Sequence, residues 1–330
     1  MSNVLLYGGF IVFVLTMLLL DLKVFHSEAK TPTTKASASW VAVWVGLAVV
    51  FGVILYFWKG GTSAGLYFTG YLIEYSLSVD NMFVFIVIFT YFRVPPAYQH
   101  QVLFYGILGA IIFRGIFIAL GVTLIQSFSW VLYVFGALLI FTAYRIAKGT
   151  EDVEPEDNPV LKIFRRYFRT TTKYYGQKLF TVENGKRLAT PLFVVLLIIE
   201  TTDIFFAIDS IPAILGIFPN PRDPDPFIVL TSNVFAILGL RALYFLLAGS
   251  MSKFHLLKYG LSIILGFVGV KMILAGFPHE SRFHFEIPIY ASLGFIIGVL
   301  AITVIASLKF PPSVTEEHLP APDPTITPPE

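Results

Sequence analysis

Cysteine is absent from the sequence, and charged residues are scarce. Without cysteine the chain can form no disulfide, no zinc–thiolate site and no thiol nucleophile. Charged side chains make up 13% of the residues, about half the share found in an average soluble domain. The basic residues lie between apolar runs rather than in one patch. We therefore expect the lipid bilayer, and not nucleic acid, to surround the chain.

Apolar residues occur in long runs instead of the stripes of soluble helices. A transmembrane helix needs about 20 mainly apolar residues, which predicts an all-α polytopic membrane protein with about nine spans. The first run ends at Asp21 and lacks the basic start and the cleavage pattern of a signal peptide, so we expect it to be retained. The predicted spans are Asn3–Leu22, Trp40–Trp58, Leu66–Phe92, Val102–Leu120, Val122–Ile146, Pro191–Phe218, Phe227–Leu247, Leu256–Phe277 and Ile287–Leu308. The fourth and fifth are separated only at Gly121, so they could also form one long helix.

The positions of Lys and Arg predict the orientation, because cytoplasmic loops are enriched in these residues. One set of loops holds Lys23, Lys30, Lys35, Arg93, the cluster from Lys148 to Arg187, Lys253, Lys258 and Lys309. The opposite set holds Lys59, Arg222 and Arg282. The N-terminus is thus predicted outside and the C-terminus in the cytoplasm. We expect a transmembrane domain over residues 1–310, containing a cytoplasmic linker at 148–189 with some helix, and a disordered Pro-rich tail at 311–330.

Acidic side chains occur inside two predicted spans, where each costs about 3 kcal/mol if it faces lipid. They must therefore face the helix bundle, a cavity or a bound cation. With their polar neighbours, they are Glu74, Asp80, Asn81, Glu200, Asp203, Asp209 and Ser210. Pro212 removes one backbone hydrogen bond beside Asp209, which predicts local unwinding of the sixth span.

The two acidic stretches have matching spacings. Six residues separate Glu74 from Asp80, and six separate Asp203 from Asp209. Arg114 and Arg241 follow at similar distances, and so do Gly136 and Gly266. Residues 66–146 and 191–277 are thus predicted to form a 3+3 inverted repeat, a common plan of transporters.

The candidate ligands are all oxygen donors, which suits Mg²⁺, Ca²⁺ or Mn²⁺ better than Zn²⁺ or Cu²⁺. Arg114, Arg241 and Lys271 are the candidate balancing charges. Five carboxylates against these three cations leave two negative charges, enough for one divalent ion or two protons. This balance favours cation/proton antiport. The other interpretations are that the charges form structural salt bridges, or that Lys271 forms a Schiff base with a chromophore.

The stretches Glu74-Tyr-Ser-Leu-Ser-Val-Asp80-Asn81 and Glu200-Thr-Thr-Asp203, with Asp209-Ser210-Ile-Pro212, resemble the TerC/Alx family of integral membrane proteins. The resemblance extends over about residues 1–310. It implies a bacterial inner-membrane protein with a LysE-like inverted-repeat core, which exports Mn²⁺ as its transported ion. Carried over to this chain, it implies metal ligands at Asp80, Glu200, Asp203, Asp209 and Ser210, with Glu74 and Asn81 close by.

Two other functions remain open. Some members of this family are linked to the metal loading or assembly of exported proteins, so a membrane scaffold with membrane protein partners is one alternative. An intramembrane hydrolase with paired aspartates is the other, but the sequence has no Gly-x-Gly-Asp motif and more carboxylates than a dyad requires. We therefore expect a transporter rather than an enzyme.

Overall fold

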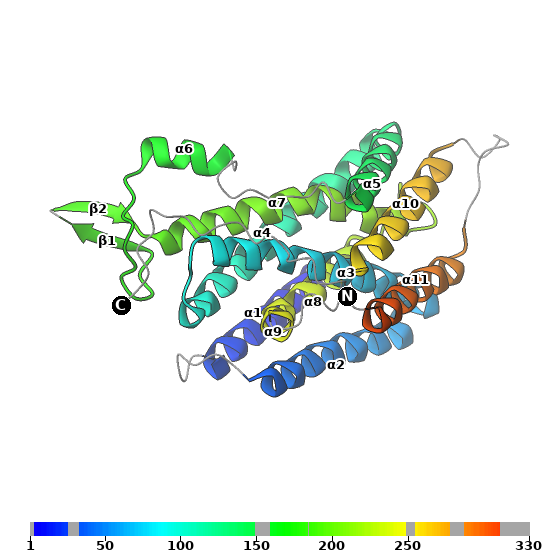
Figure 1. The fold of residues 1–330 in the computed structure, drawn as a ribbon. Coiled ribbons are helices and arrows are strands. Elements are labelled where there is room, and N and C mark those ends of the chain that lie inside the picture. Colours follow the sequence, from blue (N-terminus) through cyan, green and yellow to red (C-terminus); the bar gives the residue numbers. More distant parts are fainter. Residues whose placement is uncertain are drawn as a thin grey trace.

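The computed structural model describes residues 3–25, 33–148, 159–183, 185–248, 255–277 and 287–310. These residues form a bundle of helices with one small β-hairpin at its end (Figure 1). The helices are α1 (Asn3–Phe25), α2 (Thr34–Lys59), α3 (Gly61–Tyr91), α4 (Pro96–Ser127), α5 (Val131–Lys148), α6 (Pro159–Tyr167), α7 (Pro191–Gly216), α8 (Pro226–Leu238), α9 (Leu240–Leu247), α10 (Leu257–Gly276) and α11 (Ile289–Lys309). The strands are β1 (Phe180–Glu183) and β2 (Lys186–Ala189).

Seven of the described helices are long and apolar enough to cross a membrane, and α8 with α9 form an eighth span if the pair is counted as one. The apolar part of α1, Leu5–Leu20, is shorter. The chain is thus an all-α polytopic membrane protein, as predicted. The count of nine spans and the orientation stay predictions. The predicted tail at 311–330 lies outside the described residues, as do Lys30, Lys253 and Arg282.

The boundary between the fourth and fifth spans was predicted wrongly. Gly121 lies inside α4, and the chain turns only after Ser127, where Phe128 adopts an extended backbone. A Cβ atom at Gly121 would lie 3.0 Å from a methyl group of Ile211 on α7. The glycine therefore serves the close packing of α4 against α7, and it does not break the helix.

The predicted unwinding at Pro212 is also wrong, because α7 continues through this proline to Gly216. The break occurs instead in the seventh predicted span, where α8 and α9 meet at Gly239 with a bend of 40°. Packing neighbours tolerate one missing backbone hydrogen bond in a membrane helix. A proline alone is therefore a weak predictor of an interruption.

The centre of the bundle is formed by α3, α4, α7 and α8. Helix α4 packs on α7, α8 packs on α3, and α5 crosses α10. At this crossing a Cβ atom on Gly136 would lie 2.8 Å from the carbonyl oxygen of Gly269, so the two backbones touch. In the predicted repeat α3 corresponds to α7, α4 to α8 and α5 to α10, so the contact of α4 with α7 corresponds to the contact of α3 with α8. The inverted repeat itself stays a prediction.

The described part of the predicted linker is folded. Its helix α6 lies beside the first turns of α7, and β1 and β2 pair as an antiparallel hairpin with Phe180 opposite Ala189 (Figure 1). Tyr174 in the loop before β1 donates a hydrogen bond of 2.7 Å to the carbonyl oxygen of Phe92 at the end of α3. This segment is therefore attached to the helix bundle at more than one point.

Candidate cation site

The seven predicted site residues lie in three different surroundings. Glu74 and Asp203 lie in a buried ion-pair network, and Asp80, Asn81, Asp209 and Ser210 line a small cavity. Glu200 belongs to neither group. The helical periodicity explains this separation, because six residues turn the direction of a side chain by about 240°. Glu74 and Asp80 therefore leave α3 on different sides, as do Asp203 and Asp209 on α7.

The buried network is centred on Arg114 of α4, which is 1% exposed. Its guanidinium forms ion pairs with Glu74 of α3 and Asp203 of α7, and it reaches Asp203 with two nitrogens, at 3.0 and 3.3 Å. A third nitrogen donates to Ser210 Oγ at 3.4 Å. Arg114, predicted to balance acidic charge, thus joins three helices through a two-point contact that a lysine could not reproduce.

The cavity lies between α3, α5 and α7, where the half-buried Asp80 and Asp209 face the same space. Asn81 and Ser210 follow these aspartates in the sequence and line the cavity with them. The rest of the lining is Leu77, Thr142, Ile146 and Phe206. Asp80 of α3 and Asp209 of α7 therefore line one cavity, as predicted for these two helices. Ser210 lines the same cavity and also contacts Arg114.

Helix α5 supplies Thr142 to the cavity, a residue that the sequence reasoning missed. Thr142 donates a hydrogen bond of 3.0 Å to Asp209 Oδ1. Arg145 follows on the same helix, three residues after Thr142, and its side chain is exposed. Nothing local marks Thr142 as a site residue, because it is a single hydroxyl in an apolar helix. The crossing of α5 over the bundle core brings it to the cavity.

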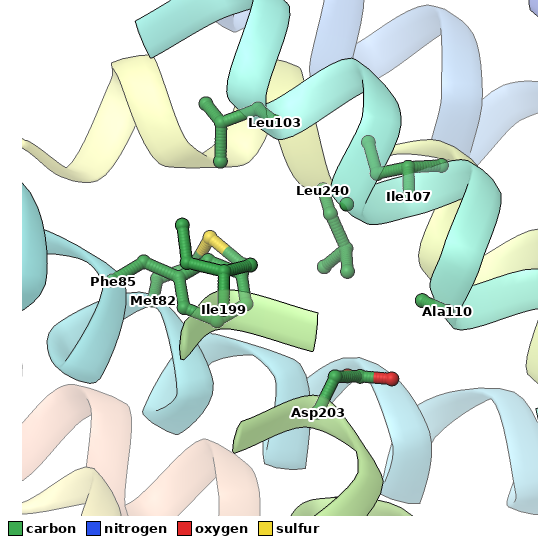
Figure 2. Close-up of a pocket in the computed structure, with 9 residues that line it drawn as sticks. Met82, Phe85, Leu103, Ile107, Ala110, Ile199, Asp203 and Leu240 are labelled. Carbon is green, nitrogen blue, oxygen red and sulfur yellow. The ribbon is translucent and has the colours of Figure 1, made fainter. Parts of the chain in front are cut away.

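Glu200 lies on α7 beside α4, where it packs against Gly109. A Cβ atom at Gly109 would overlap the carboxylate of Glu200, and Glu200 Oε2 has no hydrogen-bond partner. One turn further along α7, Asp203 lies at the edge of an apolar pocket lined by Met82, Phe85, Leu103, Ile107 and Ile199 (Figure 2). Apolar side chains therefore surround the Asp203 side of the network.

The two other predicted balancing charges are also buried. Lys271 of α10 donates to the carbonyl oxygen of Ile217 at 2.7 Å and to Ser292 Oγ at 3.3 Å. It caps the C-terminal end of α7, where a cation is favoured, and this position differs from the predicted pairing with a carboxylate. Arg241 is buried in α9, two residues after the break at Gly239.

Within the described ranges, no three acidic or histidine side chains come together closely enough to share a metal ion. The structure does not gather all seven predicted ligands, and their roles in metal binding stay predictions. The cavity offers two carboxylates, one amide and two hydroxyls, from Asp80, Asp209, Asn81, Ser210 and Thr142. Such a set matches a hard divalent cation in both donor type and charge.

Comparisons with known proteins agree with the fold. The model of the integral membrane protein TerC family matches residues 59–314. An uncharacterized membrane protein of Myxococcus xanthus is 47% identical over 321 residues, which cover 96% of this chain and 95% of that protein. An Escherichia coli protein named as membrane-bound redox modulator Alx is 45% identical over 311 residues, covering 91% and 93%.

The similarity extends to plants. The chloroplastic thylakoid membrane protein TERC of Arabidopsis thaliana is 43% identical over 277 residues, which cover 84% of this chain and 69% of that protein. No solved structure matches the chain. The family match and these identities over most of the chain show that it belongs to the TerC family of integral membrane proteins.

Proposed function

We propose that this protein exports a divalent cation, Mn²⁺, from the cytoplasm in exchange for protons. The observation that carries the proposal is the cavity that Asp80 of α3 and Asp209 of α7 line together within the membrane-spanning helices. Carboxylates at this depth are costly and are retained where they bind ions or protons. Two carboxylates balance the charge of one divalent ion, and two protons restore neutrality once the ion has left.

The separation of the acidic residues into a buried ion-pair network and a cavity supports this function. Arg114 already neutralises part of the charge of Glu74 and Asp203 and holds α3, α4 and α7 together. The cavity therefore has a wall on one side that the Arg114 network holds in place through Ser210. Such an arrangement lets a cation bind and leave without breaking the ion pairs that join the helices.

The name of the Escherichia coli relative, a redox modulator, fits this proposal better than it fits thiol chemistry. The chain has no cysteine, so it cannot exchange disulfides or bind metals through thiolates. An influence on cellular redox balance would have to act through a transported species. A redox-relevant divalent ion such as Mn²⁺ is one species that the oxygen ligands of the cavity accept.

The distribution of Lys and Arg supports a proposal for the orientation of the protein. We propose the inner membrane of a bacterial cell, with the N-terminus outside and both the folded 159–190 segment and the C-terminus in the cytoplasm. The exposed Lys and Arg side chains of that segment support this orientation through the excess of basic residues in cytoplasmic loops.

The test is a flux measurement in proteoliposomes that contain the full-length protein, with Mn²⁺, Ca²⁺ and Mg²⁺ in parallel. We expect Mn²⁺ flux that Asp80→Asn and Asp209→Asn each abolish. Asp225→Asn is the matched control, because Asp225 pairs with Lys59 outside the cavity and caps α8, a role that asparagine keeps. Unchanged flux in both cavity variants would rule out this mechanism. Absence of flux for all three ions would favour the assembly role.

A further inference from the structure

The folded segment at the end of the bundle carries a large excess of positive charge. Residues 159–190 contain eight Lys and Arg residues and one acidic residue, whereas the whole chain has a net charge of +2. The exposed basic side chains that the structure describes here are Lys162, Arg166, Arg169, Lys173, Lys178, Lys186 and Arg187. The acidic residue, Glu183, accepts a hydrogen bond of 2.7 Å from Tyr175, which lowers the pKa of its carboxyl group.

This segment directly precedes a membrane-spanning helix, because β2 ends at Ala189 and α7 begins at Pro191. Helix α7 has 26 residues and is about 39 Å long, whereas the hydrocarbon core of a bilayer is about 30 Å thick. The helix is therefore longer than the hydrocarbon core, and at least one of its ends extends beyond it. The ring of Phe193 in the first turn of α7 lies 5.4 Å from Phe164 of α6 and 4.5 Å from Phe180 of β1. These contacts attach α6 and the hairpin to the start of a membrane span.

The outer face of α6 is both basic and apolar. On its inner face, Leu161 and Phe164 are buried against the rest of the protein. On the outside of α6, Ile163 is 59% exposed and lies beside Lys162 and Arg166. Phe168 and Arg169 directly follow the helix, and the 58% exposed ring of Phe168 stacks on Phe164 with its centroid 4.6 Å away. We call Lys162, Ile163, Arg166, Phe168 and Arg169 the basic platform. A helix bathed only in water gains nothing from exposed Ile and Phe side chains, whereas the membrane interface favours this combination.

We propose that the basic platform binds the headgroups of anionic phospholipids at the membrane surface. The three cations match the phosphate charge, and Ile163 and Phe168 reach toward the upper acyl chains. Each Lys or Arg near an anionic surface contributes about 1 kcal/mol, which corresponds to about a five-fold change in binding. The proposal does not depend on which ion the protein transports.

Native mass spectrometry of the full-length protein, released from micelles with equal amounts of phosphatidylglycerol and phosphatidylcholine, tests this proposal. We expect the parent protein to retain more phosphatidylglycerol. Arg166→Gln/Arg169→Gln removes two of these charges and should lower that preference by about 25-fold. The matched control is Lys186→Gln/Arg187→Gln in strand β2, which removes the same charge away from the platform and should leave most of the preference.

A second variant, Ile163→Ser, tests the apolar part without changing the charge. Ile163 is exposed, so this substitution should leave the melting temperature unchanged while it weakens the binding of phosphatidylglycerol. An equal loss in the two double variants would show a response to net charge alone and would overturn the proposal. A parent protein that retains both lipids equally would also overturn it, and would leave an acidic protein as the partner of this surface.

Discussion

Helices α3 and α7 each carry two acidic residues six positions apart. The structure gives these residues different surroundings: Glu74 and Asp203 form one pair, and Asp80 and Asp209 form another. The first pair is fully buried and shares Arg114, whereas the second is half-buried and lines a cavity. An acid beside a buried arginine stabilises the contact between helices. An acid beside a cavity is the kind of residue that our proposal assigns to cation binding. The surroundings of the same residue type therefore depend on the helix that packs against it.

The largest expected effect would come from breaking the buried network. Arg114→Gln leaves two buried carboxylates without their cation, which should lower the free energy of unfolding by about 3–5 kcal/mol. Chemical unfolding of the detergent-solubilised protein would measure the loss. The control is Arg166→Gln, because Arg166 is exposed. If Arg114→Gln unfolds at the denaturant concentration of the parent, the network does not hold the helices together.

The second effect concerns ligand binding to the cavity. An ion that binds only the folded protein raises its stability by about 2.7 kcal/mol at 100 times the dissociation constant. We expect Mn²⁺ to raise the unfolding free energy of the parent in this way, and chelation with EDTA to reverse the change. Asp209→Asn should remain folded and lose the response. If Mn²⁺ stabilises Asp209→Asn as much as it stabilises the parent, the ion binds somewhere other than this cavity.

The third effect tests whether the crossing of α5 over α10 positions the cavity wall. Gly136→Ala places a methyl group 2.8 Å from the carbonyl oxygen of Gly269, and such overpacking costs about 1–3 kcal/mol. Because α5 carries Thr142, the substitution should weaken Mn²⁺ binding and leave the Arg114 network intact. Gly115→Ala on α4 is the control, since nothing lies within 4 Å of its added methyl group. Equal Mn²⁺ affinity in the two variants would contradict this role of the crossing.

The smallest effect is expected from the hydrogen bond between Thr142 and Asp209. Thr142→Val removes the donor and should cost about 0.5–1.5 kcal/mol in unfolding free energy, with a weaker affinity for Mn²⁺. Thr142→Ser keeps the hydroxyl and should retain both properties. Isothermal titration with Mn²⁺ would compare the three proteins. A serine variant as weak as the valine variant would show that the methyl group of Thr142, rather than its hydroxyl, matters.

Two predictions from the sequence failed for one physical reason. Gly121 and Pro212 are residues that often interrupt helices, yet α4 and α7 continue through them. The interruption lies at Gly239, where the side chain of Trp44 packs against the glycine. Local propensity predicts where a helix can break, and the neighbouring helices decide whether it does.

The sequence by itself determined that the chain lies in a membrane and that a few acidic residues lie inside the spans α3 and α7. Both properties follow from hydrophobicity and charge, which each segment carries independently of its neighbours. Only the tertiary structure decided which carboxylates meet Arg114, which ones line the cavity with Thr142, and that Lys271 caps α7. These pairings depend on how helices far apart in the sequence cross, and no single segment encodes that crossing.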